Sequence, residues 1–111
     1  MEKKLSKEIM ETVQSAYDNG NIPDRKWKRV KKCQAYYTGE GDVKVLRSYH
    51  TIVALYDYRD NLLTSYGRYS MTTYQHIRKF REVIAQDRGI APWNIEEVNL
   101  ELVNKFEERR G

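Results

Sequence analysis

Hydrophobic positions near the start of the chain follow the period of an amphipathic helix. Apolar side chains recur at intervals of three, four and one residues, which places them on one stripe of a helix. The stripe consists of Leu5, Ile9, Met10, Val13, Ala16 and Tyr17. Gly20 and Pro23 follow it. Both are typical of a helix end, because glycine closes the last turn and proline prevents its continuation. We predict a helix over residues 1–19.

The pattern then changes to the alternation of apolar and polar positions that strands require. A first strand begins between residues 27 and 30, and a glycine-rich turn at residues 38–42 ends it. A second strand covers residues 43–58, with a bend or bulge near residues 47–50, where the alternation shifts its phase. A third strand covers residues 62–70. Connections this short predict antiparallel pairing.

Helical spacing returns after the third strand. Ser70 is suited to cap a helix, because its hydroxyl accepts a hydrogen bond from a free backbone N–H group. Tyr69 and Tyr74 have the spacing of a hydrophobic staple. The apolar stripe of this helix consists of Ile77, Phe80 and Ile84, and Gly89 ends it.

A last helix is predicted to begin near Asn94, with Glu97 as its capping-box partner. Its apolar side chains are Val98, Leu102, Val103 and Phe106. With 111 residues the chain is predicted to form one domain. We expect an α+β fold: an N-terminal helix (1–19), a three-stranded antiparallel sheet (27–69) and two C-terminal helices (70–108) packed on one sheet face.

Composition narrows the classes of function. The net charge of +4 permits a nucleic-acid partner or an acidic protein partner without requiring one. A single cysteine, Cys33, excludes an intrachain disulfide and a cysteine-based zinc site. The charged N-terminus is unlike a signal peptide, and no run approaches the roughly 20 apolar residues of a membrane span. We expect no membrane association, no cofactor and no metal.

The strongest functional signal is the basic segment, residues 25–32, in which six of eight residues are Lys or Arg. Cations interleaved with aromatic rings favour single-stranded nucleic acid, because bases stack on rings while phosphates contact the cations. The same residue types also dominate protein contacts, and lysines on an edge strand block unwanted pairing. The candidate partner-binding residues are Arg25, Lys26, Trp27, Lys28, Arg29, Lys31, Lys32 and Tyr36.

The start of the helix at Ser70 offers a second candidate site. Free N–H groups at a helix N-terminus bind anions, and Arg68, Thr72, Thr73 and His76 lie close in sequence. A phosphate loop normally contains more glycines than the one present here, Gly67. Capping and anion binding therefore remain alternative interpretations of the same residues.

Catalytic signatures are missing from the sequence. HExxH, CxxC and GxSxG spacings do not occur. An enzyme would have to combine His50, His76 and Cys33 in space. We therefore predict that the chain is not an enzyme.

Two short stretches resemble a group of small uncharacterised proteins from bacteriophages and mobile elements. The shared pattern is S-Y-x-T-x-V-A, a hairpin, then Y-S-x-T-T-x-x-H. Its positions here are Ser48, Tyr49, Thr51, Val53, Ala54, Tyr69, Ser70, Thr72, Thr73 and His76. The resemblance implies a phage origin and the cytoplasm of a bacterial host, but no biochemical activity.

The predicted function is therefore that of a non-enzymatic phage accessory protein. It would bind a host protein or a protein–nucleic-acid complex of the host or its defence system, as an anti-CRISPR inhibitor does. The alternative is an accessory protein that binds DNA or RNA directly through the basic segment. A small enzyme is the third hypothesis.

Overall fold

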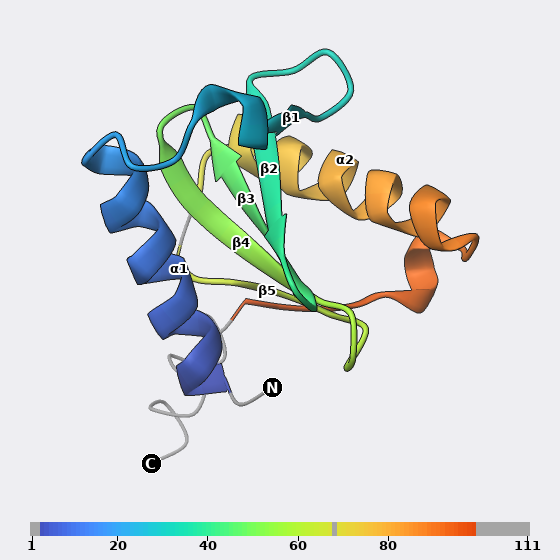
Figure 1. The fold of residues 1–111 in the computed structure, drawn as a ribbon. Helices are drawn as coiled ribbons and strands as arrows, with labels where there is room; N and C mark the ends of the chain where they lie inside the picture. The colour runs from blue at the N-terminus through green and yellow to red at the C-terminus, as the bar shows by residue number, and fades with distance from the viewer. Residues whose placement is uncertain (1–2, 68, 100–111) are drawn as a thin grey trace.

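The computed structural model describes residues 3–67 and 69–99 (Figure 1). Two α-helices, two short 3-10 helices and six strands follow one another in these residues. They are α1 (Lys3–Asp18), η1 (Asp24–Lys26), β1 (Lys28–Arg29), β2 (Ala35–Glu40), β3 (Val43–Ser48), β4 (Thr51–Asp57), β5 (Leu62–Ser65), α2 (Met71–Arg88), η2 (Pro92–Asn94) and β6 (Glu96–Asn99).

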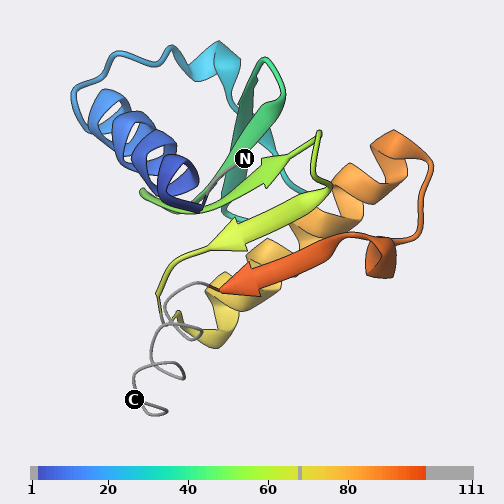
Figure 2. The ribbon, with the colours of Figure 1, turned by 90° about the horizontal axis from the view of Figure 1, so that it is seen from below.

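All six strands belong to one mixed sheet in the order β1-β2-β3-β4-β5-β6. Strands β1 to β5 form an antiparallel meander. The chain then crosses through α2 and returns as β6, which pairs parallel to β5 (Figure 2). Antiparallel neighbours follow from tight turns, whereas the parallel pair requires a long crossover such as a helix.

The two helices cover opposite faces of the sheet (Figure 1). On one face, Met10 of α1 packs in a buried cluster with Val45, Ile52 and Leu55. On the other face, α2 contributes Phe80 to the larger cluster. Full burial of one such side chain stabilises the fold by about 1.5–3 kcal/mol. The larger cluster consists of Val30, Ala35, Leu46, Val53, Ala54, Tyr56, Leu63, Ile77, Phe80, Ile84, Ala85 and Ile95.

The predicted ends of α2 are confirmed. The backbone N–H of Thr73 donates to Ser70 Oγ over 3.2 Å. The rings of Tyr69 and Tyr74 meet edge to face with centroids 5.9 Å apart, as a staple requires. Gly89 ends the helix with a left-handed φ of 68°, a conformation that only glycine adopts without cost.

The predicted architecture is wrong, although the α+β class is retained. The sheet has six strands and not three, and the described helices lie on both of its faces. The predicted strand 43–58 is the hairpin β3–β4, which turns at Tyr49 and His50, and a register shift lies between Leu46 and Arg47. The predicted first strand is likewise two strands, because Lys31 and Lys32 take positive φ angles and reverse the chain.

The predicted last helix is also wrong over the residues that the structure describes. Asn94 belongs to η2, and Glu96–Asn99 is strand β6. A capping pattern satisfies only local hydrogen bonds, whereas Leu63, Thr64 and Ser65 of β5 are buried, and buried backbone groups require hydrogen-bond partners. Strand β6 supplies them. Leu102, Val103 and Phe106 lie outside the described residues.

Candidate functional site

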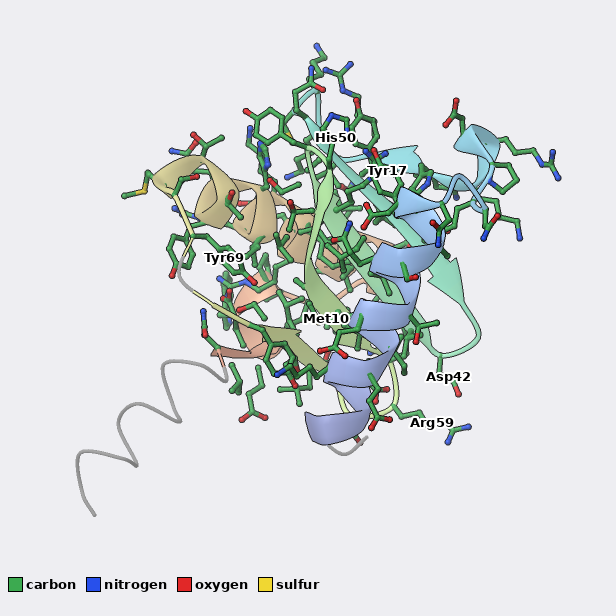
Figure 3. All side chains as sticks on the ribbon, turned by 90° about the vertical axis from the view of Figure 1, so that its left-hand side faces the viewer. Met10, Tyr17, Asp42, His50, Arg59 and Tyr69 are labelled. Atoms are coloured by element: carbon green, nitrogen blue, oxygen red, sulfur yellow. The ribbon has the colours of Figure 1, made fainter. Side chains whose placement is uncertain are left out.

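A hollow opens at one end of the sheet, where α1, η1 and the β3–β4 turn meet. It encloses about 370 Å³, and we call it the aromatic hollow. Figure 3 shows two of its residues, Tyr17 and His50, close together at this end of the molecule. The lining residues are Tyr17, Asp24, Trp27, Gln34, Tyr36, Arg47, Tyr49 and His50.

Arg47 lies at the centre of these rings with 9% of its surface exposed. Its Cζ atom lies 4.3 Å from the ring centroid of Tyr17 and 4.6 Å from those of Trp27 and Tyr36. A guanidinium over aromatic faces is stabilised by cation–π attraction. Within residues 3–67 and 69–99 no carboxylate forms an ion pair with it, and its Nε has no hydrogen-bond partner. The hollow therefore contains a buried positive charge that no carboxylate of the described residues pairs with.

A chain of hydrogen bonds connects this charge to the hollow's edge. Arg47 Nη1 donates to Tyr17 Oη over 2.9 Å and to the Tyr49 carbonyl over 2.6 Å. Tyr17 Oη lies 2.6 Å from His50 Nδ1. Because a guanidinium only donates, the Tyr17 hydroxyl accepts from Arg47, and its contact with Nδ1 extends the chain to His50. In the tautomer in which Nδ1 accepts from Tyr17, His50 Nε2 is a donor.

The basic segment borders the aromatic hollow through Trp27, which lines it. Arg25 and Lys26 are exposed on η1, and Lys28 and Arg29 are exposed on the edge strand β1. Trp27, between the two pairs, is turned inward to Arg47. Exposed cations therefore precede and follow Trp27, whose ring meets that of Tyr17 edge to face.

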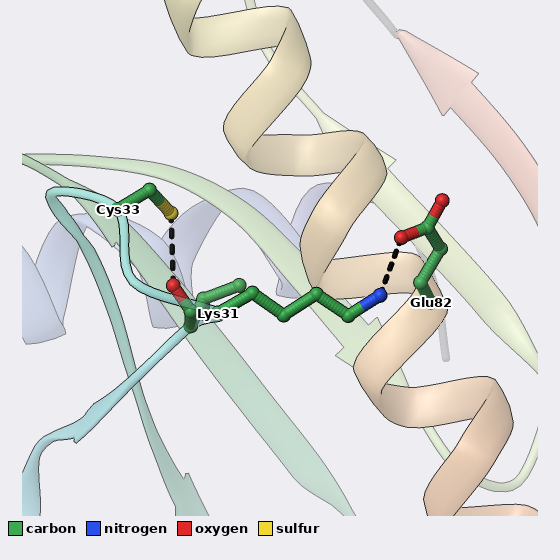
Figure 4. Close-up of polar contacts among 4 residues, drawn as sticks. Lys31, Cys33 and Glu82 are labelled. Atoms are coloured by element: carbon green, nitrogen blue, oxygen red, sulfur yellow. Dashed lines mark hydrogen bonds and ion pairs between the residues drawn. The ribbon is translucent and has the colours of Figure 1, made fainter.

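The turn between β1 and β2 lies against α2. Lys31 Nζ pairs with Glu82 Oε2 at 2.5 Å (Figure 4). This hydrogen bond lowers the pKa of the Glu82 carboxyl. Cys33 Sγ donates to the Val30 carbonyl over 2.9 Å. The charge of Lys31 is thus paired within the protein, whereas Lys32 is exposed.

A second hollow, of about 410 Å³, lies beside η1 and is lined by Arg25, Lys26, Lys28 and Lys44. Lys44 lies over the rings of Tyr37 and Tyr58 and pairs with Asp87 at 3.2 Å. Burial opposes its charged form, but hydrogen bonds to Tyr58 and Asp87 outweigh burial and raise the pKa of Lys44. Arg25, Lys26 and Lys28 thus line the second hollow, whereas Asp24 of the same 3-10 helix lines the aromatic hollow.

The second candidate site is less well supported by its surroundings. Arg68 lies outside the described residues, and Thr72 is exposed. The N–H of Thr73 is bound to the Ser70 cap. His76 is buried, with Nδ1 2.8 Å from Ser48 Oγ. Burial, assisted by nearby Lys79, lowers the pKa of His76, so the imidazole is neutral near pH 7.

The three residues of the enzyme hypothesis contact different partners. His50 contacts Tyr17, His76 contacts Ser48, and Cys33 contacts a backbone carbonyl. In the part of the chain that the structure describes, no group of three His, Cys, Asp or Glu residues is arranged to hold a metal ion. No helix in that part is long and apolar enough to cross a bilayer.

Sequence reasoning missed the residue at the centre of the site. Arg47 lies on β3 between Leu46 and Ser48, both buried. A charged residue inside a buried stretch of strand is a signal in itself, because burying a cation is costly unless groups around it compensate. Tyr17 was assigned only to the core stripe of α1. Its contact with Arg47 joins residues 30 positions apart, which no local pattern predicts.

Comparison with known proteins identifies a family for the chain but no better-understood relative. The model described as "Family of unknown function (DUF8033)" matches residues 6–92. This range includes the whole lining of the aromatic hollow and ends before β6. No curated protein matches the chain. No solved structure matches it either.

Proposed function

We propose that this chain, which belongs to DUF8033, a family of unknown function, binds single-stranded nucleic acid. The aromatic hollow is the base-binding site, and the exposed cations of the basic segment contact the phosphates. The proposal includes no catalytic step. It rests on one observation: Arg47 lies buried among aromatic rings without an ion-pair partner among the described residues, and the exposed cations Lys26 and Lys28 flank Trp27, which lines the hollow.

The physical argument concerns what these groups attract. Stacking of a base on an aromatic side chain contributes about 1–3 kcal/mol and tolerates any sequence. Phosphates are drawn to Lys and Arg, and the release of counter-ions makes the affinity depend strongly on salt. Tyr49 lines the hollow and is half exposed, and its ring lies 5.5 Å from that of His76.

The biological setting is part of the proposal. We place this binding protein in the cytoplasm of a bacterium infected by the phage that encodes it. There the same surface would engage a host or defence complex that contains nucleic acid, in an anti-CRISPR-like role. The motif shared with small phage proteins, from Ser48 to His76, is the support for this setting.

Fluorescence anisotropy with a labelled single strand of about 12 nucleotides tests the proposal, since sites of this kind span about 4–16 nucleotides. The double variant Arg25→Gln, Lys28→Gln should reduce the slope of log affinity against log salt by about 1.4, because each lost phosphate contact contributes about 0.7. The control, Lys7→Gln with Arg78→Gln, removes two exposed cations from α1 and α2 and should leave the slope unchanged.

A second pair of variants tests the rings. Tyr49→Asn removes an exposed ring, and asparagine tolerates the positive φ of 53° at this position. Loss of one stacked base should weaken binding about tenfold. Trp93→Ala removes a more exposed ring, on η2, and should have no effect. Binding that is absent at low salt, or that does not change with salt, would refute the proposed function.

A further inference from the structure

We propose that the aromatic hollow prefers guanine over the other bases and that Asp24 is the residue that selects it. This inference rests on the proposed function and adds specificity to it. Stacking alone does not distinguish bases, because every base has an aromatic face. Selection requires hydrogen-bonding groups that meet the edge of the base, and the hollow contains such groups.

Asp24 is unusual in its surroundings. It is an exposed carboxylate next to the cations of the basic segment, and it lines the aromatic hollow. Within the described residues no hydrogen bond or ion pair engages its side chain. A carboxylate weakens attraction for phosphates, so Asp24 is suited to bind hydrogen-bond donors rather than the phosphate groups of a strand. The edge of a base carries such donors.

Guanine has the edge that a carboxylate fits. Its N1–H and N2–H groups are adjacent donors, and a carboxylate accepts two parallel N–H bonds through its two oxygens. Adenine and cytosine present one amino donor beside a ring acceptor, and uracil presents one N–H between two carbonyls. Those acceptors would face a carboxylate oxygen unfavourably. Single-stranded segments expose this edge, whereas a duplex hides it.

The remaining edge of guanine carries two acceptors, O6 and N7. The hollow offers donors for them. His50 offers Nε2–H as a donor in the tautomer in which Nδ1 accepts from Tyr17. The Gln34 amide accepts from Tyr36 through Oε1 over 3.1 Å, and its NH₂ group has no acceptor among the described residues, so it is available as a donor. The volume of about 370 Å³ lies at the lower end of the range for ligand pockets, about 300–1,000 Å³.

The test compares heptamers of uridine that carry a single G, A, C or U at the centre, together with guanosine monophosphate alone. Direct titration of the unchanged chain should show about tenfold tighter binding of the G-containing strand, the discrimination expected of one bidentate contact. Asp24→Asn should remove this preference, because an amide presents one acceptor and one donor. The mononucleotide distinguishes a base held as part of a strand from a free nucleotide.

Asp42→Asn is the matched control. Asp42 is an exposed carboxylate paired with Arg59 at 2.7 Å, and Figure 3 shows it at the end of the molecule opposite to Tyr17 and His50. The change in charge is identical, so a general gain in affinity for polyanions appears in both variants. The guanine preference should persist in Asp42→Asn. Thermal melting followed by circular dichroism establishes that both variants are folded.

The outcomes separate this inference from the proposed function. Equal affinity for the four heptamers, or a preference that Asp24→Asn retains, overturns the role of Asp24 and leaves strand binding intact. Tight binding of the mononucleotide with no binding of any strand supports the guanine site and refutes the proposed function. Absence of all binding refutes both. The comparison among heptamers uses the unchanged chain and does not depend on any variant.

Discussion

His76 makes the stability of this fold depend on pH. Its imidazole is 4% exposed and lies 2.8 Å from Ser48 Oγ through Nδ1, at the contact between α2 and β3. Burial first, and then Lys79 one turn away, lower its pKa below the ordinary value of 6.5. The folded protein therefore resists protonation of this group at a pH where the unfolded chain accepts a proton.

The sign and size of the effect follow from linkage. As the pH falls below 6.5, the unfolded chain takes up a proton that the folded state does not, so the free energy of unfolding decreases. The decrease continues down to the lowered pKa of the folded state. Each pH unit in this window costs about 1.4 kcal/mol. Between about pH 7.5 and about pH 5.5 the loss from His76 is therefore at most about 1.4 kcal/mol.

Urea denaturation at these two pH values measures the loss. His76→Asn serves as the comparison, because its amide retains a hydrogen-bonding group near Ser48 but does not titrate. The quantity of interest is the difference between the two pH values within each protein, so the intrinsic cost of the substitution cancels. We expect the unchanged chain to lose more stability than His76→Asn. An equal loss in both proteins would show that His76 is not the source.

Three further predictions concern the ends of α2 and the ion pair on its surface. Ser70→Ala should cost about 1 kcal/mol of stability, because the helix cap is lost. Thr72 is exposed and outside the cap, so Thr72→Ala should change stability by less than about 0.5 kcal/mol. Urea denaturation midpoints compare the two variants. Gly89→Ala should cost about 1–2 kcal/mol in the same assay, because φ is 68° and no atom within 4 Å would contact the new Cβ, so the penalty is conformational only. Lys31→Gln should cost at most about 0.5 kcal/mol near pH 7, since both partners are more than one-third exposed. Because Lys31 lowers the pKa of Glu82, the cost of Lys31→Gln should vanish well below pH 4.5, where the carboxyl is protonated. High salt should also remove the cost, because it screens the exposed charges. A cost that persists in both conditions would contradict the ion-pair explanation.

The helices were the part of the fold most accessible to sequence reasoning. The stripe from Ile9 to Tyr17 and the cap at Ser70 depend on residues within a few positions of one another, and local patterns describe such contacts fully. Helix α1 was predicted over 1–19 and is described as Lys3–Asp18, and α2 begins and ends where Ser70 and Gly89 indicated.

The prediction of the sheet was wrong where strand pairing is not local. The turn at Tyr49 lacks glycine or proline and depends on a positive φ in a tyrosine, so the alternation appeared to continue through it. Asn94 and Glu97 have a valid capping pattern, but β5 pairs with this segment across the α2 crossover. The candidate site shows the same contrast between local features, which the sequence reveals, and contacts between distant residues. The basic segment was visible as composition, whereas Arg47 and Tyr17 meet only after the sheet has formed.

The two edges of the sheet carry opposite charge. Strand β1 presents Lys28 and Arg29, and β6 presents Glu96 and Glu97 at the far edge. A molecule with this polarity is turned by the field of a polyanion before any contact forms, so that the β1 edge approaches first. Arg81 pairs with Glu97 and partly neutralises the negative charge of the β6 edge. For the nucleic-acid partner proposed above, this asymmetry across the sheet favours encounters in which the β1 edge approaches first.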